Sequence, residues 1–152
     1  MRFLLLAVLL LLNSGPYLHS NGFLLPDPKL TPGAVRTIEP EVYCHQRTGP
    51  LRRISAATKD SVYKAFGWSL KKHPKGEIDH LVPLELGGAD VRQNLWFQPA
   101  PEFYAKDSVE NWARKQVCAG LLNGVWVQEL FKTDWTHLYQ HMKRKTLPFT
   151  PR

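Results

Sequence analysis

Residues 77–97 read EIDHLVPLELGGADVRQNLWF, and their pattern governs the predicted architecture. The first part, residues 77–86, is rich in β-branched and apolar residues but contains Pro83, which the interior of a central strand does not accept. We therefore expect a short strand that ends before Pro83, followed by a turn or edge segment. Gly87-Gly88-Ala89-Asp90 predicts a loop or hairpin turn. Asn94-Leu95-Trp96-Phe97 predicts a second short strand.

Helical patterns flank this segment on both sides. Ser55 can cap a helix that runs to about Phe66, and a second helical pattern extends from Glu102 to about Val117. Apolar residues between Val127 and Met142 recur at intervals of three and four, which predicts one final amphipathic helix. Short strands combined with helices, without internal repeats, predict a small single domain of the α+β class.

The N-terminus has the composition of a secretory signal peptide. Arg2 precedes the apolar run FLLLAVLLLL at residues 3–12, and a polar stretch begins at Asn13. Ten apolar residues are too few to cross a bilayer as a helix, which needs about twenty. We expect cleavage near Ser20 and a secreted or periplasmic protein with no membrane segment in its mature form. An uncleaved anchor or a buried helix is the alternative.

The rest of the chain divides by composition. Prolines and little periodicity predict an extended arm after the signal peptide. The expected parts are a signal peptide at 1–20, an extended arm at 21–43, a folded domain at 44–145 and a tail at 146–152. The chain has 20 Lys+Arg and 13 Asp+Glu, and removing residues 1–20 deletes only Arg2 among them, which leaves 19 − 13 = +6. This excess of positive charge predicts an anionic partner.

Cys44 and Cys118 are the only cysteines. An even pair in an exported chain predicts one disulfide, with two free buried cysteines as the alternative. The absence of a CxxC pair excludes a zinc knuckle from the sequence. A metal ion would therefore need oxygen and imidazole ligands.

Asp79, His80 and Asn94 form the candidate catalytic group. The imidazole of His80 suits a general base near neutral pH, and Asp79 offers a hard oxygen ligand for a divalent cation. Asn94 could form the hydrogen bond that fixes the tautomer of His80. The structural alternative is a surface ion pair between Asp79 and His80, with Asn94 closing a turn.

The span IDHLVPLELGG…NLWFQP…KDSVEN resembles the HNH (ββα-metal) nucleases, whose core reads DH-x-x-P-x-x-x-GG…NL followed by a helix. It is similar in particular to small exported bacterial HNH-like proteins, over about residues 27–139. The resemblance implies a ββα-metal core within residues 44–145, with His80 as general base, Asp79 as metal ligand and Asn94 as the residue that orients His80.

The resemblance also implies a second metal ligand in the first turn of the following helix, usually His or Asn. That position is Glu102 here, which departs from the pattern, and Asp107 is the fallback one turn further on. The implied cofactor is a divalent metal ion, Mg²⁺ first, with Mn²⁺, Ca²⁺ or Zn²⁺ as alternatives.

The implied activity is metal-dependent endonuclease cleavage of phosphodiester bonds in DNA or RNA with low sequence specificity. Exposed basic clusters fit phosphate contacts, and we expect Arg52, Arg53 and Lys106 near the scissile phosphate. The expected partner of the monomeric protein is nucleic acid. The alternatives are a non-catalytic basic exported module that binds nucleic acid or another polyanion, and a structural protein of the cell envelope.

Overall fold

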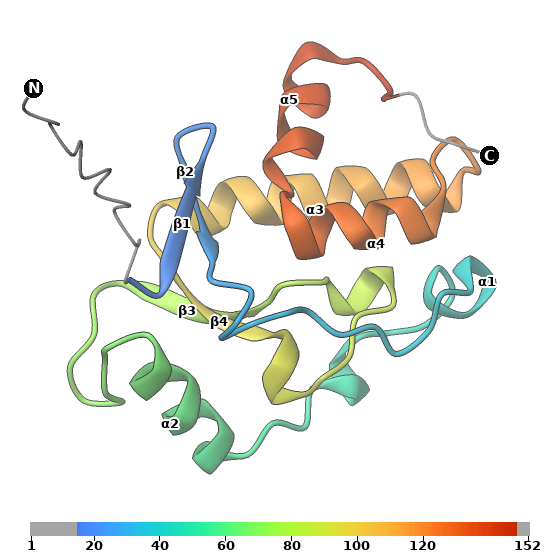
Figure 1. The fold of residues 1–152 in the computed structure, drawn as a ribbon. Coiled ribbons are helices and arrows are strands. Elements are labelled where there is room, and N and C mark those ends of the chain that lie inside the picture. Colours follow the sequence, from blue (N-terminus) through green and yellow to red (C-terminus); the bar gives the residue numbers. More distant parts are fainter. Residues whose placement is uncertain (1–14, 149–152) are drawn as a thin grey trace, which may run out of the picture.

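Two antiparallel strands and the helix that follows them form the centre of the molecule (Figure 1). β3 (Gly76–His80) pairs with β4 (Leu95–Pro99), which sets Asp79 opposite Trp96 and His80 opposite Leu95. α3 (Glu102–Cys118) begins directly after β4. The computed structural model describes residues 15–148 of the chain. Most of the predicted signal peptide and the end of the tail therefore lie outside the described residues.

The remaining elements lie on both sides of this centre. A second sheet pairs β1 (Tyr17–Ser20) with β2 (Phe23–Pro26) in antiparallel fashion. Figure 1 shows α3, α4 and α5 on one side of the β3–β4 hairpin and α2 on the other. The further α-helices are α1 (Pro40–Tyr43), α2 (Ala56–Ala65), α4 (Gly124–Thr133) and α5 (Thr136–Arg144). Residues 15–148 thus form a small mixed α+β domain, which confirms the expected fold class.

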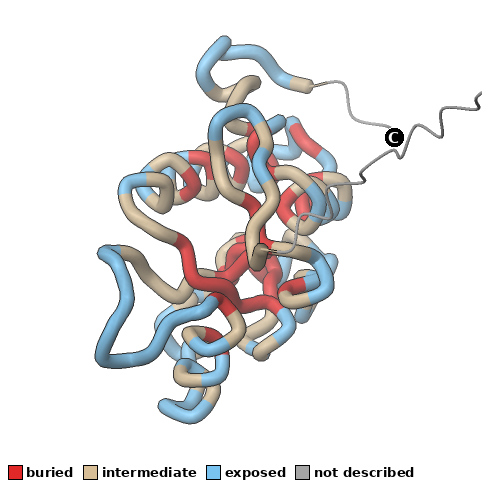
Figure 2. The backbone as a smooth tube through the Cα atoms, turned by 60° about the vertical axis from the view of Figure 1, so that its left-hand side comes forward, coloured by how far each residue is buried: buried red, intermediate tan, exposed pale blue. Residues whose placement is uncertain are grey.

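The apolar core has two clusters, and the chain crosses from one to the other directly after His80. Leu81 packs with the α2 side chains Val62 and Phe66, whereas Val82 packs with the cluster formed mainly by α3, α4 and α5. Figure 2 shows the buried tube running through the centre of the molecule, with exposed loops outside it. Burial on both sides of the chain holds the residues next to His80 in fixed positions.

The predicted disulfide is present. Cys44, the residue after α1, is bonded to Cys118, the last residue of α3, with 5.8 Å between their Cα atoms. Cross-linking residues 74 positions apart is expected to stabilise a domain by about 2–4 kcal/mol. The cross-link ties the segment before the basic turn at residues 47–53 to the central helix.

The C-terminal helix differs from its prediction. The single helix expected between Val127 and Met142 is two helices, α4 and α5, that are separated at Asp134 and Trp135. The Asp134 carboxylate accepts hydrogen bonds from the backbone N–H and the hydroxyl of Thr136, at 3.0 and 2.5 Å. Asp134 ends α4 with an extended backbone (φ −161°), and its carboxylate binds the first residue of α5, a break that the apolar period alone does not reveal.

The N-terminal segment also differs from its prediction. β1 and β2 form a hairpin whose turn is Asn21-Gly22, both with positive φ (49° and 83°), the dipeptide that favours a tight hairpin turn. The expected extended arm therefore begins inside a hairpin, and the expected cleavage point at Ser20 lies within β1. Ser20 Oγ donates to Asp134 Oδ2 at 2.5 Å, which fixes the hairpin against the start of α5. Among residues 15–148, no helix is both long enough and apolar enough to cross a bilayer.

Candidate active site

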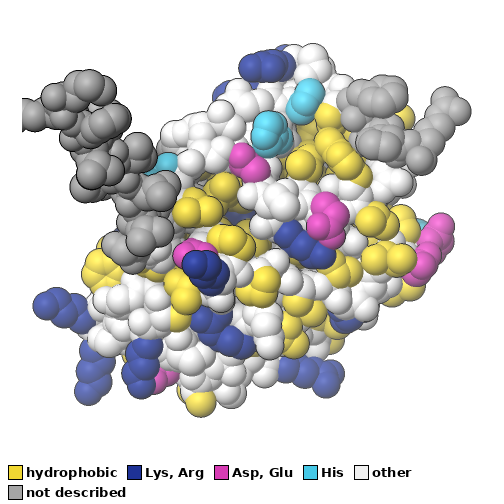
Figure 3. Space-filling model, viewed as in Figure 1, with side chains coloured by type: hydrophobic (Ala, Val, Ile, Leu, Met, Phe, Trp, Pro, Cys, Tyr) yellow, Lys and Arg dark blue, Asp and Glu magenta, His cyan; other side chains and the backbone are white. Residues whose placement is uncertain are grey.

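His80 lies at the end of β3, on the wall of a pocket of about 410 Å³. The pocket opens between β3, α2 and the turn that precedes α2. Its lining consists of Arg52, Ile54, Lys59, Tyr63, Gly76, Glu77, Ile78, His80 and Asp90. Arg52 and Lys59 are exposed, so the rim of the pocket is cationic. Figure 3 shows basic side chains along the lower edge of the molecule, on the side where α2 lies.

The imidazole of His80 is held by Asp90. Nε2 of His80 lies 2.7 Å from Oδ1 of Asp90, and His80 is only 3% exposed. Nδ1 of His80 makes no hydrogen bond with any described residue. This nitrogen is also not fully buried. One imidazole nitrogen is thus bonded to a carboxylate, while the other makes no hydrogen bond with a described residue.

Burial and hydrogen bonding set the charge states of this pair. Burial lowers the pKa of His80 from its ordinary value of 6.5, although its hydrogen bond to Asp90 acts in the opposite direction. Burial also raises the pKa of Asp90, but hydrogen bonds from the Arg53 backbone and from His80 outweigh it, so the net pKa is lowered. At pH 7 we expect neutral His80 beside ionised Asp90, the arrangement in which imidazole accepts a proton.

Asn94 has a different role from the one expected. It is fully buried, and its Nδ2 donates to the backbone oxygens of Val82 and Ala89 at 2.8 and 2.9 Å. Its Oδ1 accepts from the backbone N–H of Val82 at 2.9 Å. Asn94 therefore ties the two ends of the loop between β3 and β4 and holds the residue before Asp90. The structure gives it no hydrogen bond with His80, and Asp90 takes the orienting place instead.

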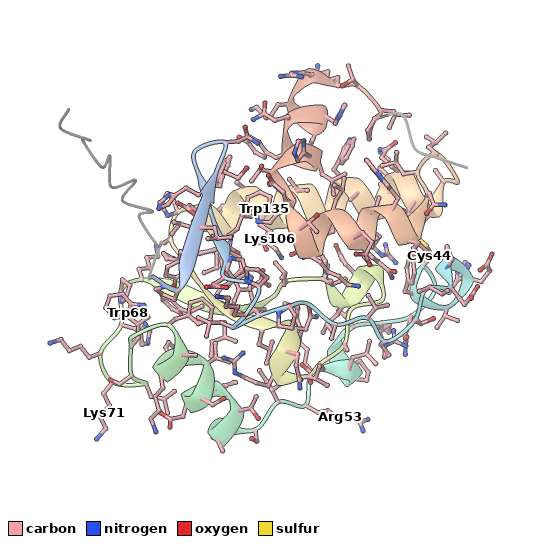
Figure 4. The ribbon with its side chains drawn as sticks, viewed as in Figure 1. Cys44, Arg53, Trp68, Lys71, Lys106 and Trp135 are labelled. Carbon is pink, nitrogen blue, oxygen red and sulfur yellow. A yellow bond between two sulfur atoms is a disulfide. The ribbon has the colours of Figure 1, made fainter. Side chains whose placement is uncertain are left out.

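Asp79 is bonded to a buried lysine. Lys106 Nζ lies 2.6 Å from Asp79 Oδ2, 2.5 Å from Glu110 Oε1 and 2.8 Å from the backbone oxygen of His80. The Lys106 side chain is 0% exposed. The expectation that Lys106 contacts the scissile phosphate is therefore corrected, because its ammonium lies inside the protein. Figure 4 shows Lys106 in the interior near Trp135, away from the basic edge marked by Lys71 and Arg53.

The second expected metal ligand is also engaged. Glu102 Oε2 accepts a hydrogen bond from the backbone N–H of Leu24 at 2.9 Å, which fixes β2 to the start of α3. Asp107, the fallback position, has a raised pKa. Burial is the larger cause, and the negative charge of Asp79 adds to it. Within residues 15–148, no group of three or more His, Cys, Asp or Glu side chains is placed to hold a metal ion. The Asp79–Glu102 pair does not fit a divalent cation, because each carboxylate already binds a group of the protein.

The two arginines lie beside the pocket as expected. The backbone N–H of Arg53 donates to Asp90 Oδ2, and its Nε donates to Pro50 O at 3.0 Å. The backbone N–H of Arg52 donates to Gly49 O at 3.2 Å, but its side chain makes no hydrogen bond or ion pair with any residue that the structure describes. Its guanidinium is therefore the exposed charge most available to an anionic ligand in this pocket.

Three residues of this region, Asp90, Lys59 and Glu110, are not among the site residues predicted from the sequence. Asp90 was included only in a turn, although an acid that closes a loop after His80 is well placed to return to it. Glu110 follows Lys106 by four residues, the spacing of a helical ion pair, which gave a usable signal. Nothing in the spacing identified Lys59 as part of the pocket, because α2 and β3 come together only in the folded chain.

Comparison of the chain with protein-family models, curated proteins and solved structures finds no match. The pocket and its surroundings are therefore the basis for assigning a function.

Proposed function

We propose that the protein is an exported nuclease that hydrolyses phosphodiester bonds of DNA or RNA in the His80 pocket. The observation that carries the proposal is the 2.7 Å pair between His80 and Asp90 on the wall of a pocket whose rim bears Arg52 and Lys59. A base and fixed positive charge are the two components that cleavage of an anionic ester requires.

His80 is the proposed general base. When the N–H on Nε2 donates a hydrogen bond to Asp90, the free lone pair of the imidazole lies on Nδ1. Nδ1 makes no hydrogen bond with a described residue. The carboxylate also stabilises the imidazolium that forms when His80 takes a proton, as the acid of a catalytic triad does. The lowered pKa of His80 keeps the base in its neutral form near pH 7.

The proposed step balances as follows. Nδ1 of His80 removes one proton from water, the water oxygen bonds to phosphorus, and the ester P–O bond breaks. The leaving oxygen takes a proton from solvent. Arg52 and Lys59 offset the negative charge that increases on the phosphoryl oxygens.

The order of the central elements supports the HNH-like part of the proposal. β3, β4 and α3 follow one another as an antiparallel pair and a helix, with Asp79 and His80 at the end of the first strand. The divalent ion that the resemblance implies has no fitting ligand pair in Asp79 and Glu102, and we therefore assign it no step.

A non-catalytic module that binds nucleic acid is the second candidate. The 3% exposure of His80 favours it, because a base must contact the water that it activates. The loop before β3 contributes exposed Trp68, Lys71, Lys72 and Lys75 beside α2, where stacking and phosphate contacts could be combined. This candidate would bind nucleic acid on the same surface without cleaving it.

The test is digestion of labelled single-stranded RNA and double-stranded DNA by the purified chain in Mg²⁺, Mn²⁺ or EDTA. We expect His80→Ala to lower the cleavage rate by roughly 10²–10⁴-fold. His137→Ala is the matched control, because His137 is a 64% exposed histidine on α5, and it should cleave like the wild type. Binding without cleavage by the wild type in all conditions would overturn the nuclease and support the binding module.

A further inference from the structure

The ammonium of Lys106 lies where the resemblance places a metal ion. That position is defined by Asp79 at the end of one strand and by the helix that follows the second strand. Lys106 reaches it from the second turn of α3, 2.6 Å from Asp79 Oδ2. The element order β3–β4–α3 and the contact with Asp79 place this ammonium between the first strand and the helix.

The ammonium is fully coordinated by the protein. It has three N–H donors, and three oxygens surround it: a carboxylate from β3, the backbone oxygen of His80, and the Glu110 carboxylate one turn along α3. Burial lowers the pKa of Lys106, but Asp79 and Glu110 raise it by more, so Lys106 remains charged. The ring of Phe131 closes the far side, with its centroid 5.5 Å from Nζ.

We propose that Lys106 is a built-in cation that replaces the divalent metal ion of this ββα arrangement. Its ammonium holds Asp79 and the backbone of His80 in place, so this position takes no metal ion. The proposal rests on the HNH-like reading of the proposed function. Lys106 is a positioning residue, because its 0% exposed side chain does not reach a ligand in the pocket.

One consequence concerns the source of positive charge in the pocket. The buried ammonium of Lys106 is paired with Asp79 and Glu110 inside the protein, and none of these three residues lines the pocket. The negative charge of the substrate must then be offset by the exposed side chains of Arg52 and Lys59. If Lys106 replaces the metal ion, EDTA should alter neither the fold nor the geometry of the site.

The decisive experiment is titration of the wild-type chain with Mn²⁺, followed by electron paramagnetic resonance and calorimetry. We expect no stoichiometric binding at submillimolar Mn²⁺ and the same melting temperature with and without EDTA. One Mn²⁺ bound per chain in the wild type, and lost in Asp79→Asn, would overturn the proposal. This readout does not depend on catalysis, so failure of the nuclease test leaves it intact.

A gain-of-site variant gives the converse test. Lys106→Ala removes the ammonium and leaves Asp79 and Glu110 facing a space, which Mn²⁺ or methylammonium should fill. We expect either cation to raise the melting temperature of this variant and not that of the wild type. Lys64→Ala is the matched control, because Lys64 pairs with Asp60 at the same four-residue separation but is 70% exposed. If Lys106→Ala folds and gains no stabilisation from either cation, the proposal fails; if it does not fold, the wild-type titration decides.

Discussion

Asp90 joins His80 to the basic turn before α2 through the two oxygens of one carboxylate. Oδ1 lies 2.7 Å from Nε2 of His80, and Oδ2 accepts the backbone N–H of Arg53. The proposed base and the cationic rim of the pocket are therefore positioned by the same side chain. This contact also explains why a carboxylate outside any helix or strand keeps a lowered pKa.

Replacing Asp90 with Asn should lower the pKa of His80 further. The hydrogen bond and the charge of Asp90 raise the His80 pKa against the larger effect of burial, and the amide supplies no charge. A proposed base that acts when neutral should give an acid limb that follows the lowered pKa of His80, and Asp90→Asn should shift that limb to lower pH. The maximal rate should fall by roughly 10²–10⁴-fold, because the tautomer is no longer fixed. Nuclear magnetic resonance titration of the His80 ring and a pH–rate profile measure both effects.

Asp60→Asn is the control for this prediction. Asp60 pairs with Lys64 on the exposed side of α2, so its replacement removes one carboxylate without touching His80. An unchanged His80 pKa in Asp90→Asn would show that the 2.7 Å contact does not govern the imidazole.

Arg52→Gln should weaken nucleic-acid binding without changing stability. The Arg52 side chain is exposed at the pocket and makes no hydrogen bond or ion pair with a described residue, so the fold does not depend on its guanidinium. Loss of one phosphate contact should reduce the slope of log affinity against log salt by about 1. Fluorescence anisotropy with a labelled oligonucleotide across a salt series measures this slope. Lys143→Gln, an exposed change on α5, should leave it unaltered, and equal slopes in both variants would contradict the assignment.

The elements were predictable where local chemistry determines them. Ser55 caps α2 through the backbone N–H of Thr58, and Pro83 ends the strand that carries His80, as expected. The helix break at Asp134 was not predictable, because it depends on the extended backbone of one residue within a continuous apolar period. The α+β class follows from the local patterns, whereas the fine arrangement of the site depends on contacts between elements.

The candidate site was only partly predictable for the same reason. Asp79, His80 and Asn94 are adjacent to one another in the fold as expected, but the partner of each comes from elsewhere. Lys106 was expected near the scissile phosphate, in a position where its ammonium could contact the substrate. It is buried because Asp79 and Glu110 converge on it, which no single segment of the sequence displays.

Lys106→Met should strongly destabilise the domain. Removing the ammonium leaves Asp79 and Glu110 as unpaired carboxylates that are 13% and 15% exposed, and breaking a buried pair in this way costs about 3–5 kcal/mol. Urea unfolding monitored by tryptophan fluorescence measures the loss in the free energy of unfolding. Lys64→Met removes a surface pair and should cost less than about 1 kcal/mol. Similar losses in the two variants would mean that the buried network contributes no more than a solvated ion pair.

The N-terminal hairpin predicts where the folded chain must begin. The Tyr17 ring lies 5.1 Å from the Phe66 ring between centroids, and its hydroxyl donates to Phe97 O at 2.8 Å. A chain that starts at Asn21 loses these contacts and all of β1. We expect it to be less stable than a chain that starts at Pro16 by at least about 1.5–3 kcal/mol, the effect of burying one large apolar side chain. Urea unfolding of the two chains measures the difference.

Mass spectrometry of the chain recovered from a secreting host completes this test, and the expected N-terminus precedes Tyr17. Tyr17→Phe in the chain that starts at Pro16 removes the hydroxyl and keeps the ring. The free energy of unfolding should then fall by only about 1 kcal/mol. Equal stability of the chains that start at Pro16 and Asn21, or an exported N-terminus at Asn21, would show that β1 is dispensable. Since Ser20 also donates to Asp134 at the cap of α5, the longer chain alone keeps the contact that joins the first strand to the last helix.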